Sequence, residues 1–326
     1  MSMMDSLEYQ HNKLLSICIP TYNRCEKLKE NLITMIPKVS SYQVCFFISD
    51  NASKDKTEDV VKEMQSLYPY IVYSRNVNNE GFDRNLEKAL KLSDTKYRWV
   101  MGDDDTIENI DISELIARIS NQYDLIVLNY RHNNMPIEDK IYTDMDQLLF
   151  EKGAHMAYIS SLIFSDQMVI NGDFIKFYDT QFIHLGVMFK FLAKQDSRVF
   201  FLSSIIVTGL PNRHSSFSDK AFKFFIIDIN ALMKLLPDFY TKKGKHGVVR
   251  KIVTDHLGYI FFLLNARIYK EIDILKFFKY YKEILAAFPP LGVVAVFISS
   301  MTPIWLLKCM VKIWKLMKVR KINRKD

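Results

Sequence analysis

Three consecutive carboxylates, Asp103, Asp104 and Asp105, follow Gly102 directly after an apolar run that ends at Met101. Adjacent carboxylates repel one another, and the repulsion costs more where apolar side chains surround them. A divalent cation would relieve this repulsion. Oxygen ligands suit Mg²⁺ or Mn²⁺, which can also bridge diphosphate oxygens. Taken alone, the triplet is explained equally well by a solvated acidic turn before the next helix.

Three further polar segments carry side chains that could bind a nucleotide; they are residues 20–24 (PTYNR), 50–53 (DNAS) and 78–85 (NNEGFDRN). Tyr22 offers a ring against which a base can lie, and Arg24 can reach a phosphate. Asp50 lies at a predicted strand end, where it can accept hydrogen bonds from a base or ribose. Gly81 permits close backbone approach, and Arg84 follows in the first turn of a predicted helix, a natural diphosphate site. Each segment alone is also typical of an ordinary turn or helix start.

The elements that must position these segments alternate between two periods. Short apolar runs predict strands at residues 14–20, 43–49, 71–73, 97–101 and 124–129. Helical spacing of apolar residues predicts helices at 27–36, after 55, around 86–90 and at 112–119. We expect Pro37 to end the first helix, and Asp55 with Glu58 to form a capping box for the second.

Strand–helix alternation with fully apolar strands predicts an α/β fold with a mainly parallel open sheet covered by helices. Ligands of such sheets bind beyond the carboxyl ends of the strands, where the four polar segments lie. From residue 221 onward the pattern is helical. We therefore expect three parts, at residues 1–217, 218–283 and 284–326.

The four segments in order, IPTYNR, DNASKDKT, NEGFDRNLEKAL and WVMGDDD, resemble the motifs of family 2 glycosyltransferases, strongly over residues 14–130 and weakly over 150–217. The GFDRN and GDDD variants are most similar to the abequosyltransferase-like branch, which adds sugars to bacterial surface polysaccharides. The resemblance implies the GT-A nucleotide-sugar-binding fold, with a helical C-terminal extension.

The resemblance also implies a role for each matching residue. The nucleoside would be bound by Pro20, Thr21, Tyr22, Arg24, Asp50 and Asn51. Arg84 is implied near the diphosphate and Asp104 near the ribose. Asp103 and Asp105 are implied as ligands of Mn²⁺ or Mg²⁺, although the triplet can be registered in more than one way.

The general base is less clearly indicated, because the acidic pair that relatives place downstream is absent. The matching stretch, residues 177–191, offers His184 first and Asp179 second, and Asp166 is a third candidate. A lone histidine among apolar residues is also typical of a core position. Arg213, in a polar loop that relatives close over the donor, could contact the diphosphate or simply be solvated.

The net charge of +7 resides in the C-terminal tail, because residues 308–326 hold eight basic residues against Asp326 alone. The stretch 284–307 has no charge but is interrupted by prolines, so a spanning helix is not favoured. We expect residues 284–326 to associate with an anionic membrane surface. The polar start of the chain predicts no signal peptide, and four scattered cysteines fit a reducing compartment.

The sequence thus predicts a metal-dependent glycosyltransferase at the cytoplasmic face of a bacterial membrane. It would move a sugar from a nucleotide-sugar donor to a hydroxyl of a lipid-linked glycan. One alternative is a non-catalytic nucleotide- or nucleic-acid-binding protein, but residues 1–307 are neutral overall and no nucleic-acid partner is expected. Another is a sugar nucleotidyltransferase, but the Gly-rich loop expected after its first strand is missing.

Overall fold

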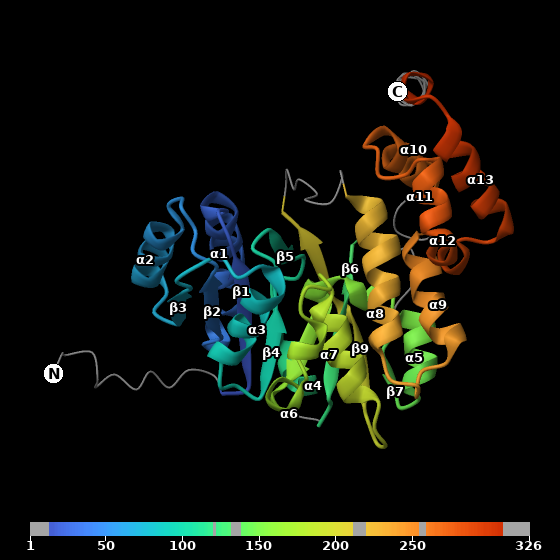
Figure 1. Cartoon of the computed structure of the whole chain (residues 1–326). Helices are drawn as coiled ribbons and strands as arrows, with labels where there is room; N and C mark the ends of the chain where they lie inside the picture. The colour runs from blue at the N-terminus through green and yellow to red at the C-terminus, as the bar shows by residue number, and fades with distance from the viewer. Residues whose placement is uncertain (1–12, 120–121, 132–137, 211–219, 254–258, 309–326) are drawn as a thin grey trace, which may run out of the picture.

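The computed structural model describes residues 13–119, 122–131, 138–210, 220–253 and 259–308. In these residues nine strands form one sheet in the order β3-β2-β1-β4-β8-β6-β9-β5, with β7 pairing β9 (Figure 1). The strands are β1 (Leu15–Thr21), β2 (Cys45–Asp50), β3 (Ile71–Arg75), β4 (Tyr97–Val100), β5 (Asp105–Ile107), β6 (Leu125–Tyr130), β7 (Lys140–Tyr142), β8 (Leu162–Ser165) and β9 (Val199–Gly209).

The first half of the sheet is parallel, as the sequence predicts. β3, β2, β1 and β4 run side by side in one direction, with Thr21 opposite Asp50 and Cys18 opposite Val100. Thr21 and Asp103 each lie three residues beyond the Cys18–Val100 pair. Chains that leave neighbouring parallel strands level with one another meet at the same sheet edge, so this register brings the PTYNR and GDDD segments together.

The second half is mixed, which corrects the expectation of a mainly parallel sheet. β8 runs antiparallel to both β4 and β6, and β5 and β7 run antiparallel to β9. β6 and β9 are parallel to each other. β5 begins within the acidic triplet, at Asp105, and it is too short for periodicity to reveal it.

Two hydrophobic cores lie on the two faces of the sheet. Leu15, Ile17 and Ile19 of β1 face one core, and Cys18 faces the other, as the alternation of a strand requires. The first core is covered by α1 (Cys25–Val39), α2 (Thr57–Leu67) and α4 (Ser113–Ile119). The second is covered by α3 (Phe82–Leu92), α5 (Met145–Lys152), α6 (Asp166–Asn171) and α7 (Ile183–Leu192).

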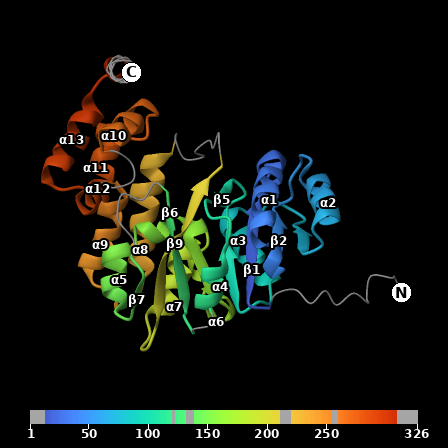
Figure 2. The same ribbon diagram turned by 180° about the vertical axis from the view of Figure 1, so that it is seen from behind.

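The helical region after β9 extends the second core. It contains a π-helical segment, Lys223–Asp228, then α8 (Ile229–Leu235), α9 (Lys242–Lys251), α10 (Tyr259–Ile268), α11 (Ile274–Lys279), α12 (Tyr281–Ala287) and α13 (Pro290–Met301). Figures 1 and 2 show α10–α13 gathered at the end of the molecule opposite β3. In the part of the chain that the structure describes, no helix is long and apolar enough to cross a membrane.

Two local predictions are wrong. Pro37 lies inside the last turn of α1, which continues to Val39. A proline removes one backbone hydrogen bond and distorts the preceding turn, and only two residues of α1 follow Pro37. The capping box does not form either. Asp55 accepts a hydrogen bond from the Thr57 amide (3.1 Å), but Glu58 pairs with Lys62 instead (2.7 Å).

Candidate active site

The acidic triplet is neutralised by an arginine of the first polar segment. The two terminal nitrogens of Arg24 contact Asp103 at 2.6 Å and Asp104 at 2.8 Å. The Thr21 hydroxyl donates to the second oxygen of Asp103 (2.7 Å). Both aspartates are buried, whereas about a third of the Arg24 side chain is exposed. The segments after β1 and β4 therefore form one ion-pair cluster.

This cluster is electrostatically frustrated. Burial raises the pKa of Asp103 to about 6, against the lowering effect of Arg24 and Thr21, and the carboxylates of Asp104 and Asp105 raise it further. The oxygen donors have the right chemistry for a hard cation. Within the described residues, however, no three His, Cys, Asp or Glu side chains form a group that could hold a metal ion. Arg24 supplies positive charge at this point instead, and a metal site at Asp103 and Asp105 remains a prediction.

Side chains of Ser160 and Asn31 hold the turn that contains the triplet. The Ser160 hydroxyl accepts from the Gly102 amide (2.9 Å) and donates to Asp105 (2.5 Å). The buried Asn31 amide of α1 donates to the Asp105 carbonyl (2.5 Å). A Cβ on Gly102 would lie 2.8 Å from a carboxylate oxygen of Asp105, so a larger residue there would force this carboxylate to shift. One carboxylate oxygen of Asp105 is thus held by Ser160.

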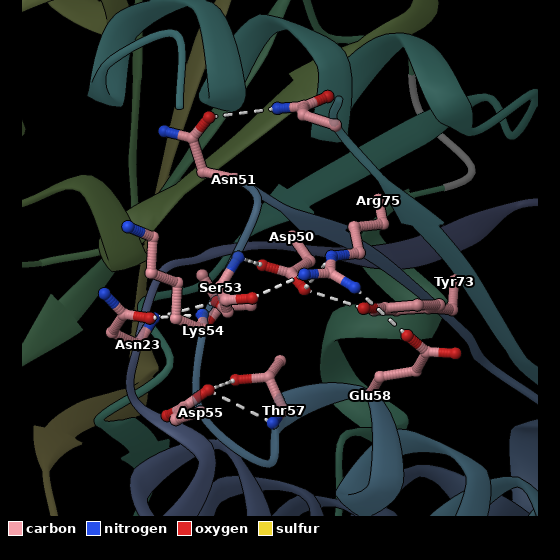
Figure 3. A network of polar contacts seen from close by, with 12 residues as sticks. Asn23, Asp50, Asn51, Ser53, Lys54, Asp55, Thr57, Glu58, Tyr73 and Arg75 are labelled. Atoms are coloured by element: carbon pink, nitrogen blue, oxygen red, sulfur yellow. Dashed lines mark hydrogen bonds and ion pairs between the residues drawn. The ribbon is translucent and has the colours of Figure 1, made fainter. Parts of the chain in front are cut away.

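Asp50 is the first residue of the second polar segment, at the end of β2, and is only 1% exposed. It accepts hydrogen bonds from the Tyr73 hydroxyl (2.7 Å) and the Ser53 amide (2.9 Å), and Arg75 lies 3.7 Å away (Figure 3). The Ser53 hydroxyl in turn accepts from the Asn23 amide (2.8 Å). Asp50 therefore orders the loop after β2 and ties it to the PTYNR segment.

Two buried asparagines attach the third polar segment to the same edge. The Asn51 amide donates to the carbonyl of Gly81 (3.1 Å), and its oxygen accepts from Asn76 (3.1 Å). Asn85 donates to the carbonyl of Ser49 (3.0 Å). Gly81 itself has φ +85°, a backbone conformation that residues with a side chain rarely adopt. All four segments therefore meet where β1, β2 and β4 end.

Arg84 faces a segment far along the chain. It contacts Asp179 at 3.0 Å and lies over the Tyr178 ring, 4.2 Å from its centroid. Asp179 is 81% exposed and has φ 65°, a strained left-handed conformation. The buried Asp83 accepts from the amide of Gln181 (3.1 Å), so α3 holds this segment at its first turn.

The three predicted bases occupy very different places. His184 is buried within α7, with Nε2 3.3 Å from the Ala157 carbonyl, and burial lowers its pKa to about 4. This is the core position that the sequence left open, and it does not suit proton transfer from an acceptor. Asp166 begins α6 after β8, where its amide bonds to Lys96 at the start of β4 (2.8 Å). That is the sheet edge opposite the triplet, which corrects the Asp166 prediction.

Of the three candidate bases, Asp179 is the one that the structure places beside another predicted site residue, Arg84.

Tyr22 is 38% exposed, so its ring is accessible for stacking with a base. Pro20 lies in β1 opposite Ser49 and is half-buried. Arg213 lies outside the described residues.

Several residues that hold the four segments in place were not singled out from the sequence. They are Asn31, Tyr73, Arg75 and Ser160. Asn31 had a detectable signal, because it interrupts the apolar stripe of α1 between Leu28 and Leu32. A polar side chain on a buried helix face needs a hydrogen-bond partner.

Comparison with known proteins agrees with this geometry. The family described as glycosyl transferase family 2 matches residues 16–174. Abequosyltransferase RfbV of Salmonella typhimurium is 27% identical over 256 residues, which cover 70% of this chain and 76% of that protein. The chain is a glycosyltransferase that resembles family 2 over residues 16–174. Its matched region contains all four polar segments.

Solved structures show that this glycosyltransferase has the GT-A-like fold. Staphylococcus aureus TarS (residues 1–349) superposes with a TM-score of 0.58 at 15% identity, covering 87% of this chain and 83% of that one. The mannosyltransferase PcManGT of Pyrobaculum calidifontis, solved with GDP-Man and Mn²⁺, superposes with a TM-score of 0.56 at 12% identity. That match covers 90% of this chain and 86% of the other.

Proposed function

We propose that this glycosyltransferase transfers a sugar from a nucleoside-diphosphate donor to a hydroxyl of a lipid-linked glycan. The observation that carries the proposal is the Arg24–Asp103–Asp104 cluster at the carboxyl ends of β1 and β4. The aspartates of this cluster are buried and Arg24 is partly exposed, so a charged ligand at this edge could replace the contacts that the charged groups make with one another.

The donor would lie across the four joined segments. Tyr22 offers a ring to the base, and Arg84 offers a guanidinium to the diphosphate. Asp50 contributes indirectly in the geometry observed, because its oxygens already accept from Tyr73 and Ser53. Asn51 has a similar role, since it fixes the loop that precedes Arg84. Direct contacts of these two residues with the nucleoside remain predictions.

A divalent cation would be held by Asp103 with Asp105 and would place positive charge at the donor diphosphate. The PcManGT structure with Mn²⁺ supports the use of such a cation in this fold. Arg24 already supplies one positive charge to Asp103 and Asp104, so we propose that Arg24 turns to the donor phosphates when the aspartates gain another partner.

Asp179 is the base that we propose. The acceptor oxygen attacks the anomeric carbon, the bond from that carbon to the diphosphate oxygen breaks, and the acceptor proton passes to the Asp179 carboxylate. Asp179 is exposed and Arg84 orients it, whereas His184 is buried with a lowered pKa. Arg84 thereby links the base with the predicted diphosphate position.

The acceptor and the location rest on the resemblance to a polysaccharide-building relative and on the basic C-terminal sequence. We propose a glycan of bacterial surface polysaccharide biosynthesis, carried on a lipid at the cytoplasmic face of the membrane. The similarity to abequosyltransferase RfbV supports the first part. The eight basic residues of 308–326 support the second.

The test is donor hydrolysis and transfer, measured with Mn²⁺ and with Mg²⁺, for four proteins. Asp103→Ala and Asp105→Ala are expected to lose activity with either metal. Asp179→Asn is expected to lower kcat by about 10²–10⁴-fold with little change in donor KM, as removal of a general base does. Unchanged activity of both alanine variants contradicts the site. Unchanged kcat of Asp179→Asn contradicts the base alone.

A further inference from the structure

Helix α13 exposes large apolar side chains to solvent and buries glycine and serine residues against the protein. Its exposed positions are Leu291 (85%), Val294 (53%), Ile298 (56%) and Met301 (52%). Its buried positions are Gly292, Val296, Ser299 and Ser300, and Ser299 bonds to the Leu263 carbonyl (3.4 Å). A surface helix in water normally shows the reverse pattern. The outer face of α13 therefore consists of large apolar side chains, whereas three of its four buried residues are glycine or serine.

The helices packed against α13 continue this exposed apolar surface. Leu275 (79%) and Phe278 (64%) project from α11, and Trp305 (68%) follows α13. Phe278 lies against Phe297 of α13, with ring centroids 6.4 Å apart. We call this set, Leu275, Phe278, Leu291, Val294, Ile298, Met301 and Trp305, the terminal apolar surface. Large apolar side chains exposed together on adjoining helices are typical of an interaction site.

Charge around the terminal apolar surface is one-sided. Its three acidic neighbours each accept a hydrogen bond from the protein: Glu271 accepts from the Phe222 amide (2.9 Å), Glu283 from Lys234 (2.8 Å), and Asp273 from the Lys276 amide (2.8 Å). Lys279, Lys282 and Lys308 are exposed on the same region. The sequence that continues from Lys308 adds seven basic residues and only Asp326 as an acid. Apolar side chains with Trp and surrounding lysines match an anionic lipid surface.

We propose that the terminal apolar surface is the part of the enzyme that docks on an anionic bilayer, with α13 lying in the interface. At about 1.5 Å per residue, twelve residues of helix reach about 18 Å, short of the roughly 30 Å of a bilayer core. The helix therefore lies on the membrane and does not cross it. The docking surface thus includes α11 in addition to residues 284–326, which the sequence predicts to associate with a membrane. It rests on the proposed function only for its purpose, which is to bring a lipid-linked acceptor to the site.

The experiment is co-sedimentation of the full chain with vesicles of phosphatidylcholine alone or mixed equally with phosphatidylglycerol. The test variant is Leu291→Ser/Val294→Ser/Ile298→Ser. The matched control is Leu67→Ser/Ile110→Ser/Ile170→Ser, which removes exposed apolar residues distant from the C-terminal helices. Thermal unfolding and sedimentation velocity without vesicles show whether each variant folds and whether the wild type self-associates.

We expect the wild type to bind the anionic vesicles, the control to bind equally, and the test variant to bind at least about tenfold more weakly. High salt should weaken wild-type binding, because part of the attraction is electrostatic. Equal vesicle binding of the wild type and a folded test variant overturns the proposal. So does a wild-type dimer that dissociates when the three test substitutions are introduced. Soluble-donor hydrolysis, measured alongside, should persist in the test variant. Vesicle binding without hydrolysis would contradict the proposed function while leaving docking intact.

Discussion

The buried carboxylate of Asp83 makes the stability of the protein depend on pH in an unusual direction. Asp83 is 3% exposed, and burial raises its pKa to about 6 from an ordinary value of 3.8. The amides of Gln181 and Ile183 only partly offset this effect, and the nearby Asp179 adds to it. Asp83→Asn retains an oxygen that can accept from the Gln181 amide but removes the charge.

The sign and the magnitude follow from proton linkage. Between pH 3.8 and 6 the folded protein binds more protons at Asp83 than the unfolded chain, so this group makes the protein less stable as pH rises. Its stabilising contribution is complete below 3.8 and lost above 6. With these two pKa values, the free energy of unfolding falls by about 1.4 kcal/mol between about pH 5 and about pH 7.5.

The assay is denaturant unfolding of the wild type and Asp83→Asn at both pH values. The free energy of unfolding of Asp83→Asn, relative to that of the wild type, should rise by about 1.4 kcal/mol when the pH is raised. Asp59→Asn, a change at an exposed carboxylate of α2, controls for the chemical substitution itself. A difference between Asp83→Asn and the wild type that is the same at both pH values refutes the reasoning.

Three further predictions test other parts of the structure. Gly102→Ala should weaken donor binding in calorimetry at least about tenfold, because the new Cβ would lie 2.8 Å from Asp105; unchanged affinity contradicts this. The buried His184, with a pKa of about 4 against 6.5, should cost stability as pH falls from 6.5 toward 4; His184→Gln should lose that part of the pH dependence in unfolding measurements. Arg24→Met should lower the free energy of unfolding by about 2 kcal/mol, less than for a fully buried pair because Arg24 is partly exposed. In a double-mutant cycle with Asp103→Asn, the two losses of unfolding free energy should not be additive. Simple additivity would mean that the contact between Arg24 and Asp103 contributes no interaction energy.

The sequence predicts the parallel half of the sheet well, because each strand there is a short, mostly apolar run. It does not predict β5 or the direction of β8. β5 has only three residues, and the direction of β8 depends on the path of the chain between β6 and β9. The wrong helix end at Pro37 has the same origin, since only the folded helix shows that a late proline is tolerated.

The positions of the candidate site residues could be predicted from the sequence better than their contacts. The strand ends locate Thr21, Asp50 and Asp103 correctly at one edge. The choice of Arg24 as the partner of the triplet could not be read from spacing, because sequence-distant charges meet only through the strand register. The choice among bases needed burial, which separates the exposed Asp179 from the buried His184.

The central claim is that the four segments at the ends of β1, β2 and β4 bind a nucleotide-sugar. The most direct measurement is a thermal-shift titration of the wild type and Asp103→Ala with a panel of nucleoside-diphosphate sugars and Mn²⁺. We predict that at least one donor stabilises the wild type, by about 2.7 kcal/mol at a hundredfold excess over Kd, and that Asp103→Ala loses this effect. No stabilisation by any donor, or equal stabilisation of the two proteins, would contradict the claim.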